Sequence, residues 1–165
     1  MERTLLMKLY HTHEKLYDIY PLFDILESCK GTTHSPEYHP EGDVFIHSLQ
    51  VLSKAMRETR DLDLLMAAML HDVGKRIDSK GHEDYAVQML DGLISEKTAW
   101  LILNHMRVWY LILGEMRKRS KVMELYQHEW FPDLVMLARW DKMGRQPHWI
   151  PKYDRVKLIE RLFVK

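Results

Sequence analysis

The sequence predicts an all-α protein, and three observations support this prediction. Apolar residues recur at three- and four-residue spacing along most of the chain, which is typical of helices with one buried face. The strict alternation of apolar and polar residues that marks half-buried strands is absent. Only seven glycines and six prolines interrupt the 165 residues, so we expect helices joined by short polar breaks.

The length of the chain predicts one domain. A chain of 165 residues is long enough to bury a single core and too short for two domains of typical size. No repeat, low-complexity tract or obvious linker divides it. We therefore expect a single compact helical domain over residues 1–165.

The N-terminal part contains two predicted helices and the longest predicted loop. A helix is expected over residues 2–20, because Pro21 disfavours helical geometry in the residue before it. A short helix over residues 22–29 follows. Residues 30–43, KGTTHSPEYHPEGD, are rich in Gly, Pro, Ser and Thr and are expected to form a loop.

Capping residues place the starts of the later helices. Asp43, then Asp61 or Asp63, and then Ser95 can each accept a hydrogen bond from the backbone of a first turn. Pro132 fits a first turn because the amide hydrogen that it lacks would have no partner there. The helices are expected at residues 44–58, 64–72, 82–93, 96–108, 111–129 (with a break near Gly114), 132–144 and 153–163.

Composition excludes several classes of protein. Lys plus Arg and Asp plus Glu both number 24, so a surface that coats nucleic acid is not expected. Cys29 is the only cysteine, which rules out an internal disulfide and a cysteine-based zinc site. The apolar N-terminal patch is too short for a signal peptide, and no apolar run has the length of a membrane span. We therefore expect a cytoplasmic protein with no membrane partner.

The strongest chemical signal is a series of histidines and aspartates, most of them inside helices that are otherwise apolar. A buried imidazole or carboxylate is costly unless it is paired or bound to a metal ion. Several such residues along one chain predict that the fold gathers them around a divalent metal. The series consists of His47, His71, Asp72, His82, His105 and Asp141.

Helical spacing places the first members of this series on buried faces. His47 shares a face with Val44 and Val51, three and four residues away. His71 and Asp72 end the apolar segment LDLLMAAMLHD. Neighbouring helical residues point about 100° apart, so this pair can reach one site only from opposite edges. Because a carboxylate has two oxygens, Asp72 could bridge two ions.

The later members have structural alternatives. His82 lies at a helix start and is free to point back toward a site, whereas His105 taken singly is more often an ordinary core histidine. Asp141 could be a buried partner of Arg139 or Arg145. We interpret the remaining histidines, at positions 11, 13, 34, 39, 128 and 148, as surface or loop packing residues.

The order His47, His71-Asp72, Asp141, with Lys75 in the string HDVGK, resembles the HD-domain metal-dependent phosphohydrolases. Several longer strings are similar to the HD domain of bacterial tRNA nucleotidyltransferases: PLFDILESCKGTTHSPEYHPEGDV, HPEGDVFIHSLQVL, LLMAAMLHDVGK, KGHEDYAVQML and LARWDKMGR. The resemblance covers about residues 21–145. It implies an HD domain over that region, and the helices expected at residues 2–20 and 153–163, the second of them amphipathic, flank it.

The resemblance also implies a ligand set. His47, His71, Asp72 and Asp141 would hold a first divalent ion. His82 and His105 match the additional histidines of two-metal members, with Asp72 bridging, and a one-metal site remains open. Mn, Fe, Co, Ni and Zn all accept His and Asp ligands, so the identity of the metal is open as well.

Signatures of other related proteins are missing. A polymerase-type domain would carry a Gly-rich segment and paired carboxylates, and the sequence contains no such combination. We therefore expect an HD domain standing alone that does not itself add CCA to tRNA. The Gly-Tyr-Pro signature of cyclic-di-GMP hydrolases is absent. Lys75 occupies the position at which small deoxynucleotidases carry a glutamate.

The resemblance implies hydrolysis of a phosphoester by metal-activated hydroxide that attacks phosphorus. Asp72 or Asp141 could also orient the attacking water. Lys75, one turn after the His-Asp pair, and Arg145, four residues after Asp141, are expected to bind the phosphate. The alternatives are a solvated lysine at a helix end and a surface arginine.

Three functions are compatible with this site. The first is a 2′,3′-cyclic phosphodiesterase or phosphatase that acts on nucleotides or RNA 3′ ends. The second is another nucleotide phosphohydrolase, for a deoxynucleoside triphosphate or a signalling nucleotide, and the third is a non-catalytic metal-containing nucleotide sensor. The basic run at 117–121, with Trp109 nearby, could contact nucleic acid, although a solvated helix face paired with Glu115 and Glu124 is favoured. The oligomeric state is open.

Overall fold

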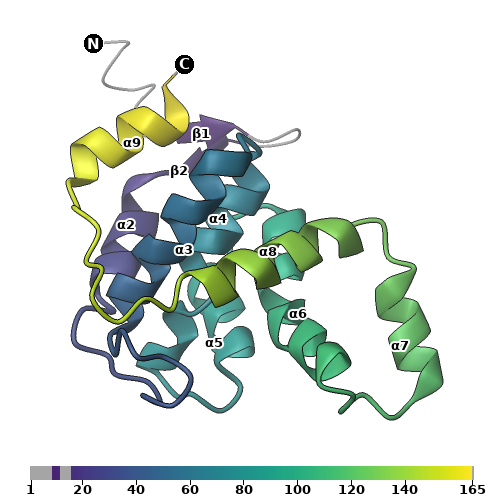
Figure 1. The fold of residues 1–165 in the computed structure, drawn as a ribbon. Helices are drawn as coiled ribbons and strands as arrows, with labels where there is room; N and C mark the ends of the chain where they lie inside the picture. The colour runs from purple at the N-terminus through teal and green to yellow at the C-terminus, as the bar shows by residue number, and fades with distance from the viewer. Residues whose placement is uncertain (1–8, 12–15, 165) are drawn as a thin grey trace.

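The computed structural model describes residues 9–11 and 16–164 and confirms the all-α class. Helices form the body of the molecule, and two short strands lie at its N-terminal end (Figure 1). The helices of the described part are α2 (Tyr20–Glu27), α3 (Val44–Glu58), α4 (Leu62–Leu70), the 3₁₀ helix η1 (Val73–Arg76), α5 (His82–Met89), α6 (Glu96–Ile112), α7 (Arg119–Tyr126), α8 (Phe131–Met143) and α9 (Arg155–Phe163).

The predicted helix over residues 2–20 is wrong wherever the structure describes it. Strands β1 (Leu9–His11) and β2 (Leu16–Asp18) pair antiparallel, with Leu9 opposite Asp18. The prediction for residues 2–8 and 12–15 lies outside the described part of the chain. Leucine and tyrosine are compatible with both kinds of element, and pairing between two chain segments overrides their helical spacing. Pro21 does not end a helix but lies in the first turn of α2.

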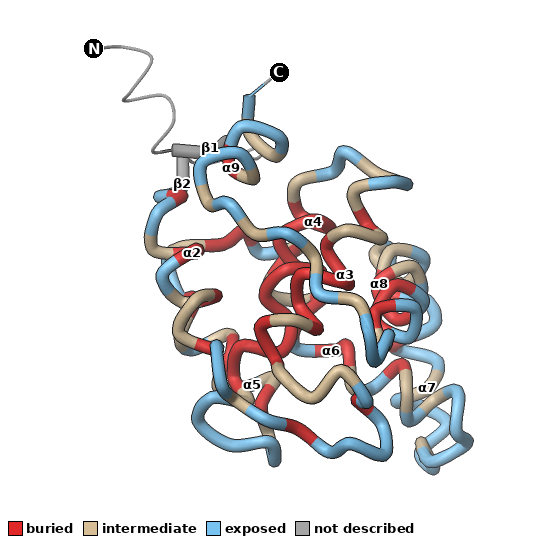
Figure 2. Tube along the Cα trace, turned by 60° about the vertical axis from the view of Figure 1, so that its left-hand side comes forward, coloured by how far each residue is buried: buried red, intermediate tan, exposed pale blue. Residues whose placement is uncertain are grey.

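Helices α3, α6 and α8 build the core around α4. All three pack against it, and every residue from Asp63 to Leu70 is buried. The buried segments of α3 and α4 lie at the centre of the molecule in Figure 2. This arrangement agrees with the apolar character that the segment LDLLMAAML shows on nearly all sides.

Side-chain caps set three of the helix starts as predicted. The Asp43 carboxylate accepts a hydrogen bond from the Ile46 amide at 3.1 Å. Asp61, rather than Asp63, caps α4 by accepting from the backbone amide of residue 63 at 2.9 Å. Ser95 accepts from the Thr98 amide at 3.1 Å and starts α6. The helix predicted at 64–72 therefore begins at Leu62 and ends at Leu70, just before the His-Asp pair.

The predicted helix at 111–129 is divided. Residues 111 and 112 complete α6, the chain then leaves helical geometry, and α7 begins only at Arg119. The predicted break near Gly114 is confirmed, and it is wider than one residue because residues 115–118 are also outside the helices. Helix α7 therefore extends to one side of the molecule rather than continuing α6 (Figure 1).

Two glycines bring distant elements into close contact. A Cβ atom on Gly74 would lie 1.8 Å from the carbonyl oxygen of His82, so η1 and α5 can pack this closely only with glycine there. A Cβ atom on Gly144 would lie 2.6 Å from Cγ2 of Val51, where the end of α8 meets α3. Each contact sits within a few residues of a predicted metal ligand, so both help to assemble the site.

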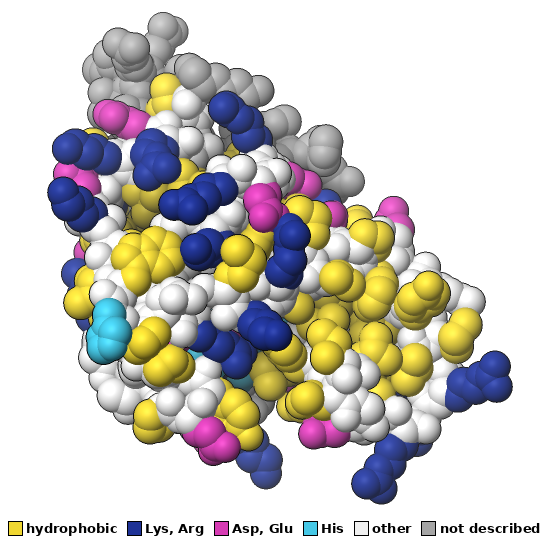
Figure 3. All heavy atoms as spheres, in the orientation of Figure 1, with side chains coloured by type: hydrophobic (Ala, Val, Ile, Leu, Met, Phe, Trp, Pro, Cys, Tyr) yellow, Lys and Arg dark blue, Asp and Glu magenta, His cyan; other side chains and the backbone are white. Residues whose placement is uncertain are grey.

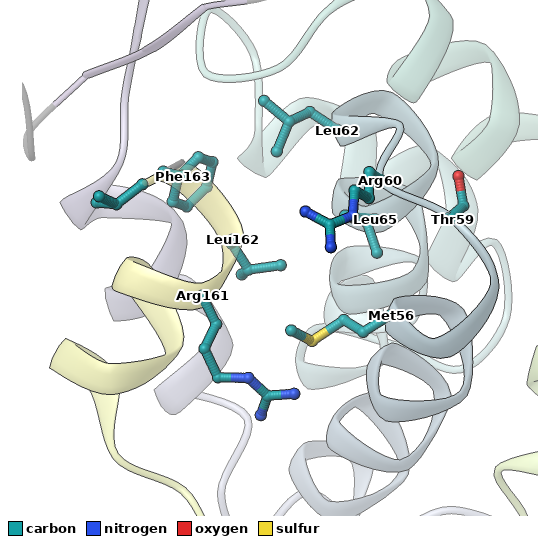
Figure 4. Close-up of a pocket in the computed structure, with 9 residues that line it drawn as sticks. Met56, Thr59, Arg60, Leu62, Leu65, Arg161, Leu162 and Phe163 are labelled. Atoms are coloured by element: carbon teal, nitrogen blue, oxygen red, sulfur yellow. The ribbon is translucent and has the colours of Figure 1, made fainter.

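A surface pocket of about 310 Å³ opens between the end of α9 and the α3–α4 junction. Figure 4 shows Arg60 and Arg161 entering it from these two sides, with Leu162 and Met56 between them. None of the predicted metal ligands lines this pocket. None of the described helices combines the length and the apolar character needed to cross a membrane.

Candidate metal centre

The six predicted metal ligands lie together in the interior, and all six are buried. They are contributed by four helices, α3, α5, α6 and α8, and by the turn that follows α4. The set consists of His47 on α3, His71 directly after α4, Asp72 directly before η1, His82 at the start of α5, His105 on α6 and Asp141 on α8. The fold therefore gathers residues that are up to 94 positions apart in sequence.

His47, His71 and Asp141 form a first group that could hold a metal ion. Nε2 of His47 lies 2.8 Å from Oδ1 of Asp141, and Nε2 of His71 lies 3.6 Å from the same oxygen. Oδ2 of Asp72 lies 3.5 Å from each of these two nitrogens. Four possible donor atoms thus converge, which are the four predicted for the first ion.

Asp72, His82 and His105 form a second such group. Nε2 of His82 lies 3.1 Å from Oδ1 of Asp72, and Nε2 of His105 lies 3.5 Å from it. The two oxygens of Asp72 therefore face different groups, Oδ2 toward the first and Oδ1 toward the second. This is the arrangement that a bridging carboxylate requires.

The histidine rings are oriented so that each Nε2 atom points into the site. The Nδ1 atoms of His71, His82 and His105 lie 3.0, 2.9 and 2.5 Å from the carbonyl oxygens of Ala68, Ser79 and Ile102. A carbonyl only accepts, so each Nδ1 carries a proton, and each ring in its neutral form keeps the lone pair of Nε2 for another partner.

Two features show that a cation fits this arrangement. Nε2 of His71 is buried without a hydrogen-bond partner among the described residues. Nε2 of His82 and Nε2 of His105 lie 3.0 Å apart, and two lone pairs at this distance need a proton or a cation between them. Imidazole nitrogens and carboxylate oxygens together suit a first-row divalent ion such as Mn, Fe, Co, Ni or Zn.

The electrostatics of the site keep its carboxylates ionised. Burial opposes ionisation of Asp72, but Lys75 and the surrounding histidines outweigh it and hold the pKa of Asp72 well below its usual range. Burial likewise opposes ionisation of Asp141, and hydrogen bonds from His47 and His71 outweigh it and lower the pKa of Asp141. Both carboxylates are therefore negatively charged at neutral pH.

The surroundings of His47 favour its charged form. Burial lowers its pKa, but hydrogen bonds to Asp141 and Glu41 outweigh this effect and raise the pKa to about 10. Its Nδ1 atom lies 2.7 Å from Oε1 of Glu41 and 3.0 Å from the carbonyl oxygen of Gly144. In the absence of a metal ion, His47 therefore carries a proton on each ring nitrogen.

Lys75, one of the predicted phosphate ligands, lies inside the protein rather than in solvent. Its Nζ atom is 3.0 Å from Oδ2 of Asp72, 3.2 Å from Nδ1 of His34 and 3.4 Å from Nε2 of His39. An ammonium has three protons, and these three acceptors can engage all of them. The alternative of a solvated helix-end lysine is wrong, because only 9% of this side chain is exposed.

Arg145, the second predicted phosphate ligand, lies at the edge of the site with 23% of its side chain exposed. Its guanidinium is 5.2 Å from the centre of the Trp109 ring and 3.7 Å from Oδ2 of Asp141. Trp109 donates a hydrogen bond from Nε1 to that same oxygen at 3.1 Å. Arg139, the other arginine considered as a partner of Asp141, pairs with Glu58 instead.

Three residues beside the site were not recognised from the sequence. His34 and His39 are not surface residues, because they are 9% and 7% exposed, and they stack with ring centres 3.9 Å apart. Glu41 lies beside them with 1% of its side chain exposed. The string HPEGD before the first ligand helix carried this signal, but loop composition alone does not show that the loop folds inward.

Comparisons with known proteins agree with this arrangement. A family model described as the HD domain matches residues 44–155, which is more than half of the chain. The Multifunctional CCA protein of Thioalkalivibrio sulfidiphilus is 35% identical over 79 residues, which cover 44% of this chain and 19% of that protein. The Multifunctional CCA protein of Acinetobacter baylyi is 39% identical over 59 residues, which cover 36% of this chain and 14% of that protein.

The match thus spans less than a fifth of the length of these relatives. The predicted resemblance to the HD domain of tRNA nucleotidyltransferases is confirmed by these similarities. The matched region contains all six of the gathered histidines and aspartates. The chain belongs to the HD domain family, which indicates the metal-dependent phosphohydrolase superfamily.

Proposed function

We propose that this protein is a phosphohydrolase that acts on nucleotide or RNA-end phosphoesters, of the 2′,3′-cyclic phosphodiesterase or phosphatase type. One observation carries the proposal: the two oxygens of Asp72 face two separate groups of histidines at 3.1 to 3.5 Å. A shared carboxylate between two metal sites is typical of enzymes that cleave phosphoesters with paired ions.

The protein's own residues prepare the site for this chemistry. Asp72 and Asp141 supply negative charge, and His47, His71, His82 and His105 direct nitrogen donors at the same space. Divalent ions held there would acidify water and neutralise charge on phosphate oxygens. Burial of all six side chains lowers the local dielectric and strengthens these electrostatic effects.

Arg145 is the better placed of the two predicted phosphate ligands. Its side chain is partly exposed, its guanidinium is fixed over Trp109, and its Nε atom has no hydrogen-bond partner among the described residues. A guanidinium can bind two phosphate oxygens at once. Lys75 would have to give up a contact with Asp72, His34 or His39 to bind phosphate directly, so we propose that it acts mainly through its charge.

The substrate class rests on the similarity to the HD region of the CCA proteins, because the residues of the site are equally compatible with other nucleotides. Extended nucleic-acid binding has less support. Over α7 and α8, Figure 3 shows mainly hydrophobic side chains with lysines and arginines at the edge. In the basic run, Lys121 pairs with Glu124 at 3.4 Å. A nucleotide or a single RNA 3′ end therefore suits the site better than a long strand.

The test is hydrolysis of 2′,3′-cyclic AMP with added Mn²⁺ or Ni²⁺, followed by separation of the nucleoside monophosphates. We expect turnover that requires the metal and that Asp72→Ala abolishes. Asp91→Ala, which changes an exposed aspartate in a turn, is the matched control and should keep full activity. Metal-loaded protein without turnover would refute the cyclic phosphodiesterase assignment. Assays on deoxynucleoside triphosphates and signalling nucleotides would then separate another phosphohydrolase from a non-catalytic sensor.

A further inference from the structure

The loop that precedes α3 is folded against the metal centre and is held there by backbone contacts. The amide of His34 donates to the carbonyl of Gly42 at 3.2 Å, and the amide of Val44 donates to the carbonyl of Thr32 at 2.9 Å. The amide of Gly31 donates to the Asp43 carboxylate at 2.6 Å. These bonds close the loop upon itself and place three buried side chains, His34, His39 and Glu41, beside His47.

Glu41 is a buried carboxylate whose described ionic partners are all histidines. Its Oε1 atom lies 2.7 Å from Nδ1 of His47, 2.9 Å from Nδ1 of His39 and 3.7 Å from Nε2 of His34. Burial opposes its ionisation, but the hydrogen bonds from His39 and His47 outweigh burial and lower its pKa to about 2. Glu41 is therefore an anion that faces the back of a predicted metal ligand.

Lys75 determines which nitrogens of the stacked pair carry protons. An ammonium only donates, so Nδ1 of His34 and Nε2 of His39 must accept from it. The protons of the two neutral rings then lie on Nε2 of His34 and Nδ1 of His39, which are the atoms that face Glu41. The pKa of His34 is lowered to about 3, by burial and then by Lys75, which agrees with a neutral ring.

We propose that Glu41 is a positioning residue for the metal centre that acts along two routes. It binds Nδ1–H of His47 directly, so Nε2 of His47 is presented to the ion. Through His39, which it binds at 2.9 Å and which stacks on His34, it also positions Lys75, and Lys75 in turn contacts Asp72. A carboxylate behind a ligand histidine fixes its tautomer and makes it a stronger donor, and loss of such a partner typically weakens metal binding about 10- to 100-fold. The inference rests on the proposed metal-dependent function.

The same three residues could be considered as a third ion site, because their donor atoms lie within 4.8 Å of one another. Nε2 of His34 and Oε2 of Glu41 are also buried without hydrogen-bond partners among the described residues. An ion on the Glu41 side of the rings would, however, move the ring protons to the nitrogens that face Lys75. The N–H groups of His34 and His39 would then face the Lys75 ammonium at 3.2 and 3.4 Å, which is repulsive. The contacts therefore favour hydrogen bonds among these residues over a bound ion.

The test compares Glu41→Gln with wild type in Co²⁺ affinity, Co²⁺ stoichiometry and the visible spectrum of bound Co²⁺. We expect a folded variant with unchanged stoichiometry, an affinity lower by about 10- to 100-fold and an altered spectrum. Glu37→Gln, at an exposed position of the same loop, is the matched control and should match wild type. If Glu41→Gln does not fold, the measurement is made on Glu41→Asp, which keeps the charge but shortens the reach, and a weaker affinity is again expected.

Two outcomes would overturn the proposal. Unchanged Co²⁺ affinity in a folded Glu41→Gln variant would show that Glu41 does not position His47. Loss of a whole equivalent of ion would make Glu41 a ligand of a third site instead. The experiment measures ion affinity rather than turnover, so it tests the positioning role separately from the proposed function. Wild-type protein that binds Co²⁺ but cleaves no phosphoester would refute the proposed function, and the affinity of Glu41→Gln would still test the positioning role.

Discussion

The Nζ atom of Lys75 lies 3.0 Å from Oδ2 of Asp72, the oxygen that also faces His47 and His71. A buried ammonium thus lies against the carboxylate that joins the two groups of predicted metal ligands. Its remaining protons are directed to two neutral imidazoles, His34 and His39. The contact links the loop before α3 to the chemistry of the site, and it suggests the first of five predictions.

Replacing Lys75 by methionine should lower kcat/KM for the phosphoester substrate by about 10- to 100-fold. The change removes charge-assisted hydrogen bonds, each of which is worth about 1.5 to 3 kcal/mol, and leaves the ring nitrogens that accepted them unpaired. Steady-state kinetics of the folded, metal-loaded variant measures the loss. Lys80→Met, at an exposed position nearby, is the control. Activity equal to wild type would show that the Lys75 charge contributes nothing to turnover.

Replacing Arg145 by glutamine should raise KM more than it lowers kcat. The guanidinium lies at the edge of the site, where it would meet a phosphate in the bound substrate as well as in the transition state. A rise in KM of about tenfold corresponds to the loss of one charged hydrogen bond. Arg139→Gln, on the helix that ends just before Arg145 but paired with Glu58, should behave like wild type. A pure kcat effect would argue against a binding role for Arg145.

Replacing His105 by glutamine should remove one metal ion from a two-ion site. His105 belongs to the group with Asp72 and His82, so its loss leaves the first group with all four of its donors. Native mass spectrometry of metal-loaded protein counts the ions directly. His128→Gln, which alters a histidine stacked on Trp100 instead, should leave the count unchanged. A count of one ion in the wild-type protein would establish the one-metal alternative.

Metal binding should release protons and should strengthen as pH rises. The pKa of His47 is raised to about 10, so its Nε2 is protonated at neutral pH and must lose that proton to an ion. Each displaced proton makes the affinity rise about tenfold per pH unit below that pKa. In metal-free protein, the contribution of this charged histidine to stability is complete below its ordinary pKa and is lost as pH rises toward 10.

Isothermal titration of the protein with Co²⁺, in buffers with different ionisation enthalpies, counts the released protons. The expected result is a dependence of the binding enthalpy on the buffer that corresponds to about one proton or more per ion. A binding enthalpy that is the same in every buffer would show that His47 is already neutral before the ion binds.

Replacing Gly74 by alanine should destabilise the protein by about 3 kcal/mol or more. The new Cβ atom would lie 1.8 Å from the carbonyl oxygen of His82, so η1 and α5 would have to separate. Urea denaturation measures the change in the free energy of unfolding. Because the separation also moves Asp72 away from His82, binding of the second ion should weaken. Stability close to that of wild type would mean that η1 can shift at little cost.

Much of the fold follows from local patterns in the sequence. Asp43 and Ser95 cap helices at the predicted positions because a side-chain oxygen can satisfy a free backbone amide wherever a helix starts. The residues before α2 do not follow such a pattern. There, pairing of Leu9–His11 with Leu16–Asp18 replaces a predicted helix, since strand pairing depends on a second segment that local spacing does not include.

The candidate site divides in the same way. The sequence shows polar residues on apolar helix faces, and the family resemblance indicates which of them act together. In the structure, His47 and His71 lie 2.8 and 3.6 Å from Asp141. His34, His39 and Glu41 were not recognised, because they belong to a loop rich in turn-forming residues. A loop of this composition is usually exposed, and only its folding against α3 buries these side chains.

The identity of the ligand residues and the all-α class thus depend on the chemistry and spacing of amino acids, which local sequence contains. Other features depend on packing between distant segments. They are the direction of each Nε2 atom, the contacts of Lys75 with Asp72 and two histidines, and the position of Glu41 behind His47. The tertiary structure determines the hydrogen-bond partner of each buried group. Burial removes water as a competing partner, so each remaining hydrogen bond is stronger and its loss costs more free energy.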